Sequence, residues 1–157
     1  MTLSGWRIIK SRYVNSAWSG DGASQYPGRW NQAGIPAIYL AECISLAALE
    51  LLVHLDSSAI LQSYALAEAR FDESLIGNLS DVDLPKNWRE VPVPESTRIL
   101  GTTWLQARTS VVMRVPSAVI PMQFNYLLNP EHVDFKHIEL LSPKPFDFDS
   151  RLASKGS

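Results

Sequence analysis

Segment 37–55, AIYLAECISLAALELLVHL, contains two apolar patterns of different kinds. Residues 37–41 form a short apolar run after Pro36, and this run predicts a buried strand. Residues 46–55 are rich in leucine and alanine, with apolar side chains on every side of a helical wheel. They predict a helix that is buried all round, with Ser45 as its N-cap. A strand followed closely by a buried helix indicates a mixed α and β fold.

The flanking sequence adds more elements of both types. Further strands are expected over 6–12, 60–71, 111–115, 118–122 and 137–141, where β-branched or alternating residues occur. A second helix is expected over 94–107, because Pro94 and Glu95 suit a first turn and apolar residues follow at helical spacing. Residues 16–28 are expected to form a long loop and 72–94 an irregular connection.

Length and charge narrow the classes of protein. The 157 residues predict a single domain over 1–157, with a tail from about 152 to 157. The net charge of -2 and scattered basic residues argue against direct binding of nucleic acid. We find no apolar run long enough for a membrane span and no signal-peptide pattern, so a cytoplasmic location is expected. The single cysteine, Cys43, is interpreted as a core residue.

Glu50 is the most informative residue, because it lies among leucines in a helix without a polar face. Removing a carboxylate from water costs several kcal/mol unless it is paired or hydrogen-bonded. Three interpretations remain open: an active-site carboxylate, a buried salt bridge, or an exposed edge of the helix. His54, one turn later, suits a metal or acid–base pair with Glu50, but a core or helix-end histidine is the simpler interpretation.

The run 27–34, PGRWNQAG, places Arg29 in a turn-rich segment just before the expected strand. A guanidinium fork suits two oxygens of a phosphate or carboxylate, so Arg29 is a candidate ligand-binding residue. An Arg–carboxylate pair that holds a surface loop explains the pattern equally well. Tyr39, within the strand, is either a core aromatic or a platform for a flat ring.

Two later motifs carry polar residues. Ser117 follows Pro116 in VPSA, without the GxSxG turn of a nucleophilic serine, so a turn-forming role is the simpler interpretation. Asn125 and Asn129 in NYLLNP are interpreted as turn or cap residues.

Taken together, these blocks resemble the RES domain, a family named for its Arg, Glu and Ser. In chain order the blocks are a basic strand with Arg12, GDGA at 20–23, GRWN with Arg29, IYLA with Tyr39, LAALELLVH with Glu50, VPSA with Ser117, FNYLLNP with Asn125 and FDFDSRL at 146–152. They span almost the whole chain. Tyr26 and Pro27 precede GRWN where relatives often have further small residues, which leaves Arg29 in place.

The resemblance implies a compact α/β (α+β) fold similar to ADP-ribosyltransferases, with a split or mixed central sheet flanked by helices. It also implies a toxin that degrades NAD by hydrolysis or phosphorolysis of the nicotinamide–ribose bond. NAD is then a substrate rather than a cofactor. The sequence agrees, because it has no GxGxxG segment of the kind that follows a strand in a Rossmann cofactor site. The implied partner is an Xre-type antitoxin that covers the active site and binds DNA itself, with a possible toxin dimer in the complex.

In that chemistry Glu50 and Arg29 are the expected catalytic residues, and no metal is expected. Glu50 would stabilise positive charge on the ribose as nicotinamide leaves. Arg29 and Arg12 would bind the pyrophosphate. Tyr39 would stack on nicotinamide, while Ser117 and Asn125 would orient the substrate. The alternatives are a protein ADP-ribosyltransferase, a non-catalytic binding module and a metal-dependent hydrolase that uses Glu50 and His54.

Overall fold

The computed structural model describes residues 1–56, 58–80 and 82–153. Its strands form one sheet in the order β4-β5-β6-β2-β1-β3-β7, and β8 pairs with β3 beside this path. The strands are β1 (Thr2–Lys10), β2 (Ile38–Ala41), β3 (Tyr64–Asp72), β4 (Ile76–Asn78), β5 (Val112–Pro116), β6 (Phe124–Leu128), β7 (Glu139–Leu140) and β8 (Lys144–Phe146). The helices are α1 (Asp21–Gln25), α2 (Ile44–Leu52) and α3 (Glu95–Ala107), and the described residues also form short 3-10 helices at 11–16, 59–61, 73–75, 133–137 and 150–152.

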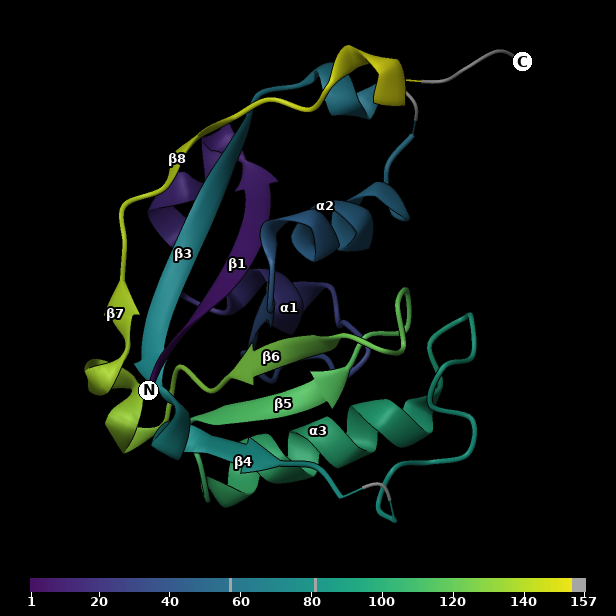
Figure 1. The fold of residues 1–157 in the computed structure, drawn as a ribbon. Helices are drawn as coiled ribbons and strands as arrows, with labels where there is room; N and C mark the ends of the chain where they lie inside the picture. The colour runs from purple at the N-terminus through teal and green to yellow at the C-terminus, as the bar shows by residue number, and fades with distance from the viewer. Residues whose placement is uncertain (57, 81, 154–157) are drawn as a thin grey trace.

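The sheet is mixed and nearly split in two. β4 pairs with β5 in parallel, whereas the other pairs are antiparallel. β1 and β2 are joined at a single register pair, Trp6 with Ala41, while β1 and β3 pair along their whole length. In Figure 1 β1 and β3 form the upper half, and β4, β5 and β6 form the lower half. The predicted mixed α/β fold with a split sheet is confirmed.

Alternating strand residues fill the two faces of the lower half. On one face Ile38, Leu40, Val112, Tyr126 and Leu128 belong to one buried cluster. On the other face Met113, Val115 and Leu127 pack with Trp30 and with Leu105 of α3. Since successive side chains of a strand point to opposite faces, both faces bury apolar residues. Across the seam α2 covers the upper half, where Leu46 and Ala47 pack with Ile8 and Tyr64.

Several expected elements are confirmed with shifted ends. The strands expected over 6–12, 37–41, 60–71, 111–115 and 137–141 correspond to β1, β2, β3, β5 and β7, and both helices form. Cys43 rather than Ser45 is the N-cap of α2. The expectation that this helix is buried all round is wrong, because Leu49 and Val53 are exposed by 40% and 59%. The helix packs on the sheet with one side only.

Other expectations are corrected more substantially. Residues 118–122 are a turn, and the strand that follows β5 is β6, which contains Asn125. The expected loop 16–28 contains the short helix α1, and the expected connection 72–94 contains the short strand β4. Most of the predicted tail, 154–157, lies outside the described residues.

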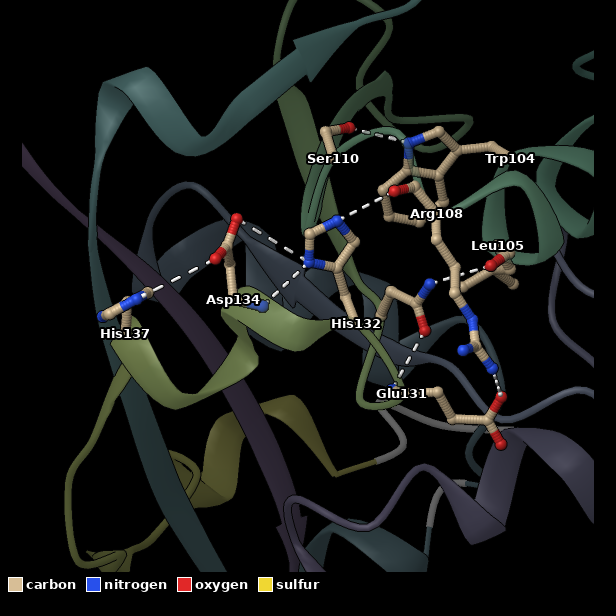
Figure 2. A network of polar contacts seen from close by, with 9 residues as sticks. Trp104, Leu105, Arg108, Ser110, Glu131, His132, Asp134 and His137 are labelled. Carbon is tan, nitrogen blue, oxygen red and sulfur yellow. Dashed lines mark hydrogen bonds and ion pairs between the residues drawn. The ribbon is translucent and has the colours of Figure 1, made fainter.

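The end of α3 is fixed by the chain that follows β6 (Figure 2). The amide of Asn129 donates to the carbonyl oxygen of Leu105 at 2.8 Å, and His132 Nε2 lies 3.0 Å from the carbonyl oxygen of Arg108. Because Asp134 N–H donates to His132 Nδ1, the proton on the ring is placed on Nε2, which donates to Arg108. Asn129 is therefore a cap residue, as predicted, and it fixes α3 to the sheet.

Among the residues that the structure describes, no helix has both the length and the apolar content needed to cross a bilayer.

Candidate active site

Glu50 lies where the two halves of the sheet meet. It extends from α2 toward the ends of β5 and β6, and its Oε1 accepts two hydrogen bonds: from Ser117 Oγ at 2.6 Å and from Asn125 Nδ2 at 2.7 Å. Asn125 pairs with Ala41 on β2 and with Val115 on β5, so it lies beside the seam. The structure therefore brings together three of the residues expected at the site, from α2, the turn after β5 and β6.

Within the described ranges, the carboxylate of Glu50 is fixed by hydrogen bonds and not by a salt bridge. Among the described residues no lysine or arginine nitrogen lies within 4.0 Å of it. Its Oε2 has no hydrogen-bond partner in the part of the chain described, which leaves this oxygen to meet a ligand. The amide oxygen of Asn125 is buried beside it and likewise has no donor among the described residues. The buried salt bridge is therefore not observed at this residue.

Ser117 is hydrogen-bonded both to its own turn and to Glu50. Its side chain is fully buried, and its oxygen accepts the backbone N–H groups of Val119 at 3.1 Å and Ile120 at 3.0 Å. The same hydroxyl donates to Glu50. With its proton and both lone pairs engaged, the hydroxyl is held in one orientation. This hydrogen bonding fits the predicted turn-forming role and an orienting role better than a nucleophilic one.

The GRWN loop is organised around Asn31, which is fully buried. The amide oxygen of Asn31 accepts from Tyr39 Oη at 2.6 Å and from Gly28 N–H at 2.8 Å. Its amide nitrogen donates to the carbonyl oxygens of Ala23 and Ile35. Trp30 N–H donates to the Tyr39 hydroxyl at 3.0 Å, so that hydroxyl both donates and accepts. Burial raises the pKa of the Tyr39 hydroxyl, which stays protonated at neutral pH.

Gly28 has a specific steric reason to be glycine. A Cβ at this position would lie 2.7 Å from Tyr39 Cζ, closer than real Cβ contacts allow. The tyrosine ring therefore packs against the backbone of the loop and anchors the loop to β2. Tyr39 thus has a structural role, and its predicted stacking on nicotinamide remains a prediction.

Arg29 is held by the segment that sequence reasoning left without a role. Its Nη1 donates to the carbonyl oxygens of Trp88 and Glu90, both at 2.8 Å. Burial lowers the pKa of Arg29, the charge of Glu50 opposes this effect and the charge of Arg98 adds to it. The backbone at Trp88 and Glu90 therefore fixes Arg29 at a position where the charge of Glu50 still affects it.

Helix α3 supports the same loop from the other side. Arg98 Nε donates to the carbonyl oxygen of Gly28 at 3.1 Å, and Arg98 Nη2 donates to that of Pro27 at 3.4 Å. Gln32 N–H donates to Thr102 Oγ1 at 3.0 Å. The side chains of α3 thus hold the backbone on both sides of Arg29.

Two candidates from the sequence lie apart from this group. Arg12 is exposed, and its guanidinium lies 4.9 Å from the ring centroid of Tyr13. Its predicted contact with pyrophosphate has no support from any contact to the other site residues. His54 is exposed beyond the end of α2, as the helix-end interpretation predicts. No cluster of three metal-ligating side chains occurs among the described residues.

Sequence reasoning missed two contributors to the site. Asn31 follows Trp30 within GRWN, and its position close to Arg29 was the only available signal. Arg98 is sixty-nine positions after Arg29, and no local pattern marks it. The carbonyl oxygens of Trp88 and Glu90 carry no side-chain signature, so no sequence pattern can reveal their role.

The family model of the RES domain matches residues 4–149, and the chain belongs to this family. This confirms the resemblance drawn from the sequence motifs.

Individual relatives extend this assignment. The chain is 43% identical to the protein named Toxin Res of Yersinia enterocolitica (serotype O:8 / biotype 1B), over 94% of this chain and 97% of that protein. It is 31% identical to the Prs ADP-ribosylating toxin of Sphingobium sp. (strain YBL2), over 99% of each. Among solved structures, the M. tuberculosis MbcT-MbcA toxin-antitoxin complex contains a chain that matches with a TM-score of 0.76 at 17% identity. That match covers 94% of this chain and 85% of the other, and it shows a shared fold.

Proposed function

We propose that the protein is the toxin of a toxin–antitoxin pair and that it cleaves the nicotinamide–ribose bond of NAD. The observation that carries this proposal is the carboxylate of Glu50, fixed through one oxygen by Ser117 and Asn125 and free at the other among the described residues. The name Toxin Res of one relative supports a toxin, and the name Prs ADP-ribosylating toxin of another supports chemistry on ADP-ribose.

The geometry fits the charge that develops in this reaction. As the bond between C1′ and the nicotinamide nitrogen breaks, both electrons leave with the neutral base and positive charge builds up on the ribose. The free oxygen of Glu50 would stabilise this charge and hold a ribose hydroxyl. The amide oxygen of Asn125, which accepts no hydrogen bond from the described residues, would accept one from the substrate. Water, phosphate or a protein side chain then adds to C1′ and gives up a proton.

Nicotinamide release from NAD by the purified, antitoxin-free protein tests this proposal. Glu50→Gln keeps the size of the side chain and an oxygen that accepts hydrogen bonds, but it removes the charge. We expect a loss of about 10²- to 10³-fold in the rate, with little change in thermal stability. Glu139→Gln is the matched control, because Glu139 is exposed on β7, and it should release nicotinamide at the wild-type rate. A wild-type protein without activity, or an unchanged rate in Glu50→Gln, would contradict the proposal.

Transfer of ADP-ribose to a protein is the second candidate, and the 31% identity to an ADP-ribosylating toxin favours it. NAD labelled in its adenylate half separates the two reactions. Cleavage leaves the label on a small molecule, whereas transfer leaves it on a protein. A binding module without catalysis would show neither product. A metal-dependent reaction would stop on addition of a chelator.

The partner we propose is an Xre-type antitoxin that covers the site around Glu50 and carries the DNA contact. The toxin–antitoxin assembly of the structural relative supports this arrangement. A complex purified with the antitoxin should release no nicotinamide until the antitoxin is removed.

A further inference from the structure

We infer that Arg98 is the second cation of the substrate site and that, with Arg29, it binds the diphosphate of the dinucleotide. The inference rests on the proposed function and names a residue for the diphosphate that joins the two nucleosides of the substrate. Arg12 was the sequence-based choice for this role, but it is Arg98 that hydrogen-bonds the residues directly before Arg29.

The position of Arg98 follows from its hydrogen bonds. Its Nε and Nη2 donate to the carbonyl oxygens of Gly28 and Pro27, the two residues directly before Arg29. These two bonds fix the plane of the guanidinium against the loop, and its Nη1 has no acceptor among the described residues. The guanidinium is therefore held in place with donor capacity left for a ligand.

Among the residues that the structure describes, neither guanidinium has a carboxylate counter-ion. Arg70, Arg108 and Arg151 each have a carboxylate oxygen within 4.0 Å, but in the described part of the chain Arg29 and Arg98 have none. Glu95, one helical turn before Arg98, instead accepts from Gln32 Nε2 at 2.7 Å. Both cations are bound through backbone carbonyl oxygens, which orient a guanidinium without neutralising it.

The two charges repel each other in the free protein. The charge of Arg98 lowers the pKa of Arg29. The charges of both guanidinium groups also lower the pKa of the Tyr39 hydroxyl, against the larger effect of burial. An anion bound between them would relieve this repulsion. The diphosphate of a dinucleotide carries two adjacent negative phosphates, and a planar fork of donors matches phosphate oxygens.

A simpler role must be separated from this one, because Arg98 also supports the loop. If the side chain only held Gly28 and Pro27, its loss would affect every substrate equally. If it binds the diphosphate, its loss would affect only substrates that contain phosphate. Shortening the substrate therefore separates a binding role from a structural one.

The experiment measures kcat/KM for NAD, nicotinamide mononucleotide and nicotinamide riboside with the wild type, Arg98→Gln and Arg98→Lys. For NAD we expect Arg98→Gln to lose roughly 10- to 100-fold, mainly through KM, as for loss of a charged hydrogen bond. Nicotinamide riboside has no phosphate, so kcat/KM of Arg98→Gln for this substrate should fall by less than about threefold. Arg98→Lys keeps the charge without the fork and should lie in between. Lys136→Gln removes one exposed positive charge and should leave all three substrates unaffected. An equal loss for NAD and for the riboside would overturn the inference.

Calorimetric binding of ADP provides a readout that does not depend on turnover. Wild type should bind ADP at least about tenfold more tightly than Arg98→Gln, and this result would support the diphosphate site even if NAD were not cleaved. Equal affinities would overturn the inference. If Arg98→Gln bound inorganic phosphate more weakly than the wild type but bound ADP equally well, the site would be one for free phosphate. This result would also overturn the inference. If Arg98→Gln does not fold, the comparison with Arg98→Lys decides the same question.

Discussion

At the scale of single residues, Ser117 shows how one hydroxyl serves both the fold and the site. It accepts two backbone N–H groups of its own turn and donates to Glu50. Because the side chain is fully buried, water does not replace these bonds when the hydroxyl is removed.

Ser117→Ala should therefore lower both stability and activity. We expect a loss of about 1–3 kcal/mol in the free energy of unfolding, because two partly buried backbone donors lose their acceptor. Nicotinamide release should fall roughly tenfold or more, because Glu50 loses one of its two donors. Ser110→Ala is the control, since Ser110 Oγ accepts from Trp104 Nε1 away from Glu50. It should lose some stability and retain full activity, and equal activities of the two variants would contradict the role of Ser117.

At the scale of elements, the contact between α3 and the GRWN loop determines where Arg29 lies. Gly101 allows this contact, because a Cβ on it would lie 1.7 Å from the carbonyl oxygen of Trp30. The contacted atom belongs to the backbone, so it has no side-chain rotation with which to move away.

Gly101→Ala should destabilise the protein by roughly 2 kcal/mol or more, as overpacking does, although alanine favours a helix by about 1 kcal/mol. Gly22→Ala is the matched control, because Gly22 lies in α1 and a Cβ there would meet nothing within 4 Å. It should be neutral or stabilising. Urea denaturation measures both variants, and a stable Gly101→Ala protein would show that the helix and loop are not in tight contact.

The elements also show what a sequence can and cannot reveal. The strand and helix over 37–55 were predictable because apolar runs of these lengths mark elements that pack on a core, although the run did not reveal that the helix is buried on one side only. β6 was missed because NYLLNP contains two asparagines that suit turns, although Asn125 pairs with Ala41 in the sheet. Tertiary pairing overrode the local preference there. Cys43 rather than Ser45 is the N-cap because α2 begins at Ile44, two residues earlier than predicted.

The site was predicted only in part for the same reason. Glu50 is marked by the contrast between its charge and its neighbours, and Arg29 by its glycine-rich turn. Arg98 and the carbonyl oxygens that hold Arg29 come from distant segments, which only the fold brings together. Contacts between such segments leave no periodic trace in one sequence.

At the scale of the whole molecule, several carboxylates make stability depend on pH. The hydrogen bond from Arg70 lowers the pKa of Glu68 from its usual 4.5, and hydrogen bonds from Ser74 and Arg151 lower those of Asp72 and Asp149 from 3.8. A carboxyl group with a lower pKa in the folded state binds fewer protons there than in the unfolded chain. It therefore adds stability above its unfolded pKa, and this contribution is lost as pH falls through the folded value.

We accordingly expect the free energy of unfolding to decrease between about pH 5 and about pH 2. Glu68→Gln should reduce the slope, because a glutamine side chain does not titrate, and its cost at neutral pH should be small, because the partner Arg70 is partly exposed to water. Urea denaturation across this range, with wild type and variant in parallel, measures both effects. Glu139→Gln removes an exposed carboxylate on the neighbouring strand, and its slope should stay closer to that of the wild type. A Glu68→Gln slope equal to that of the wild type would mean that the pair with Arg70 does not hold in solution, and that acid sensitivity arises from the remaining carboxylates.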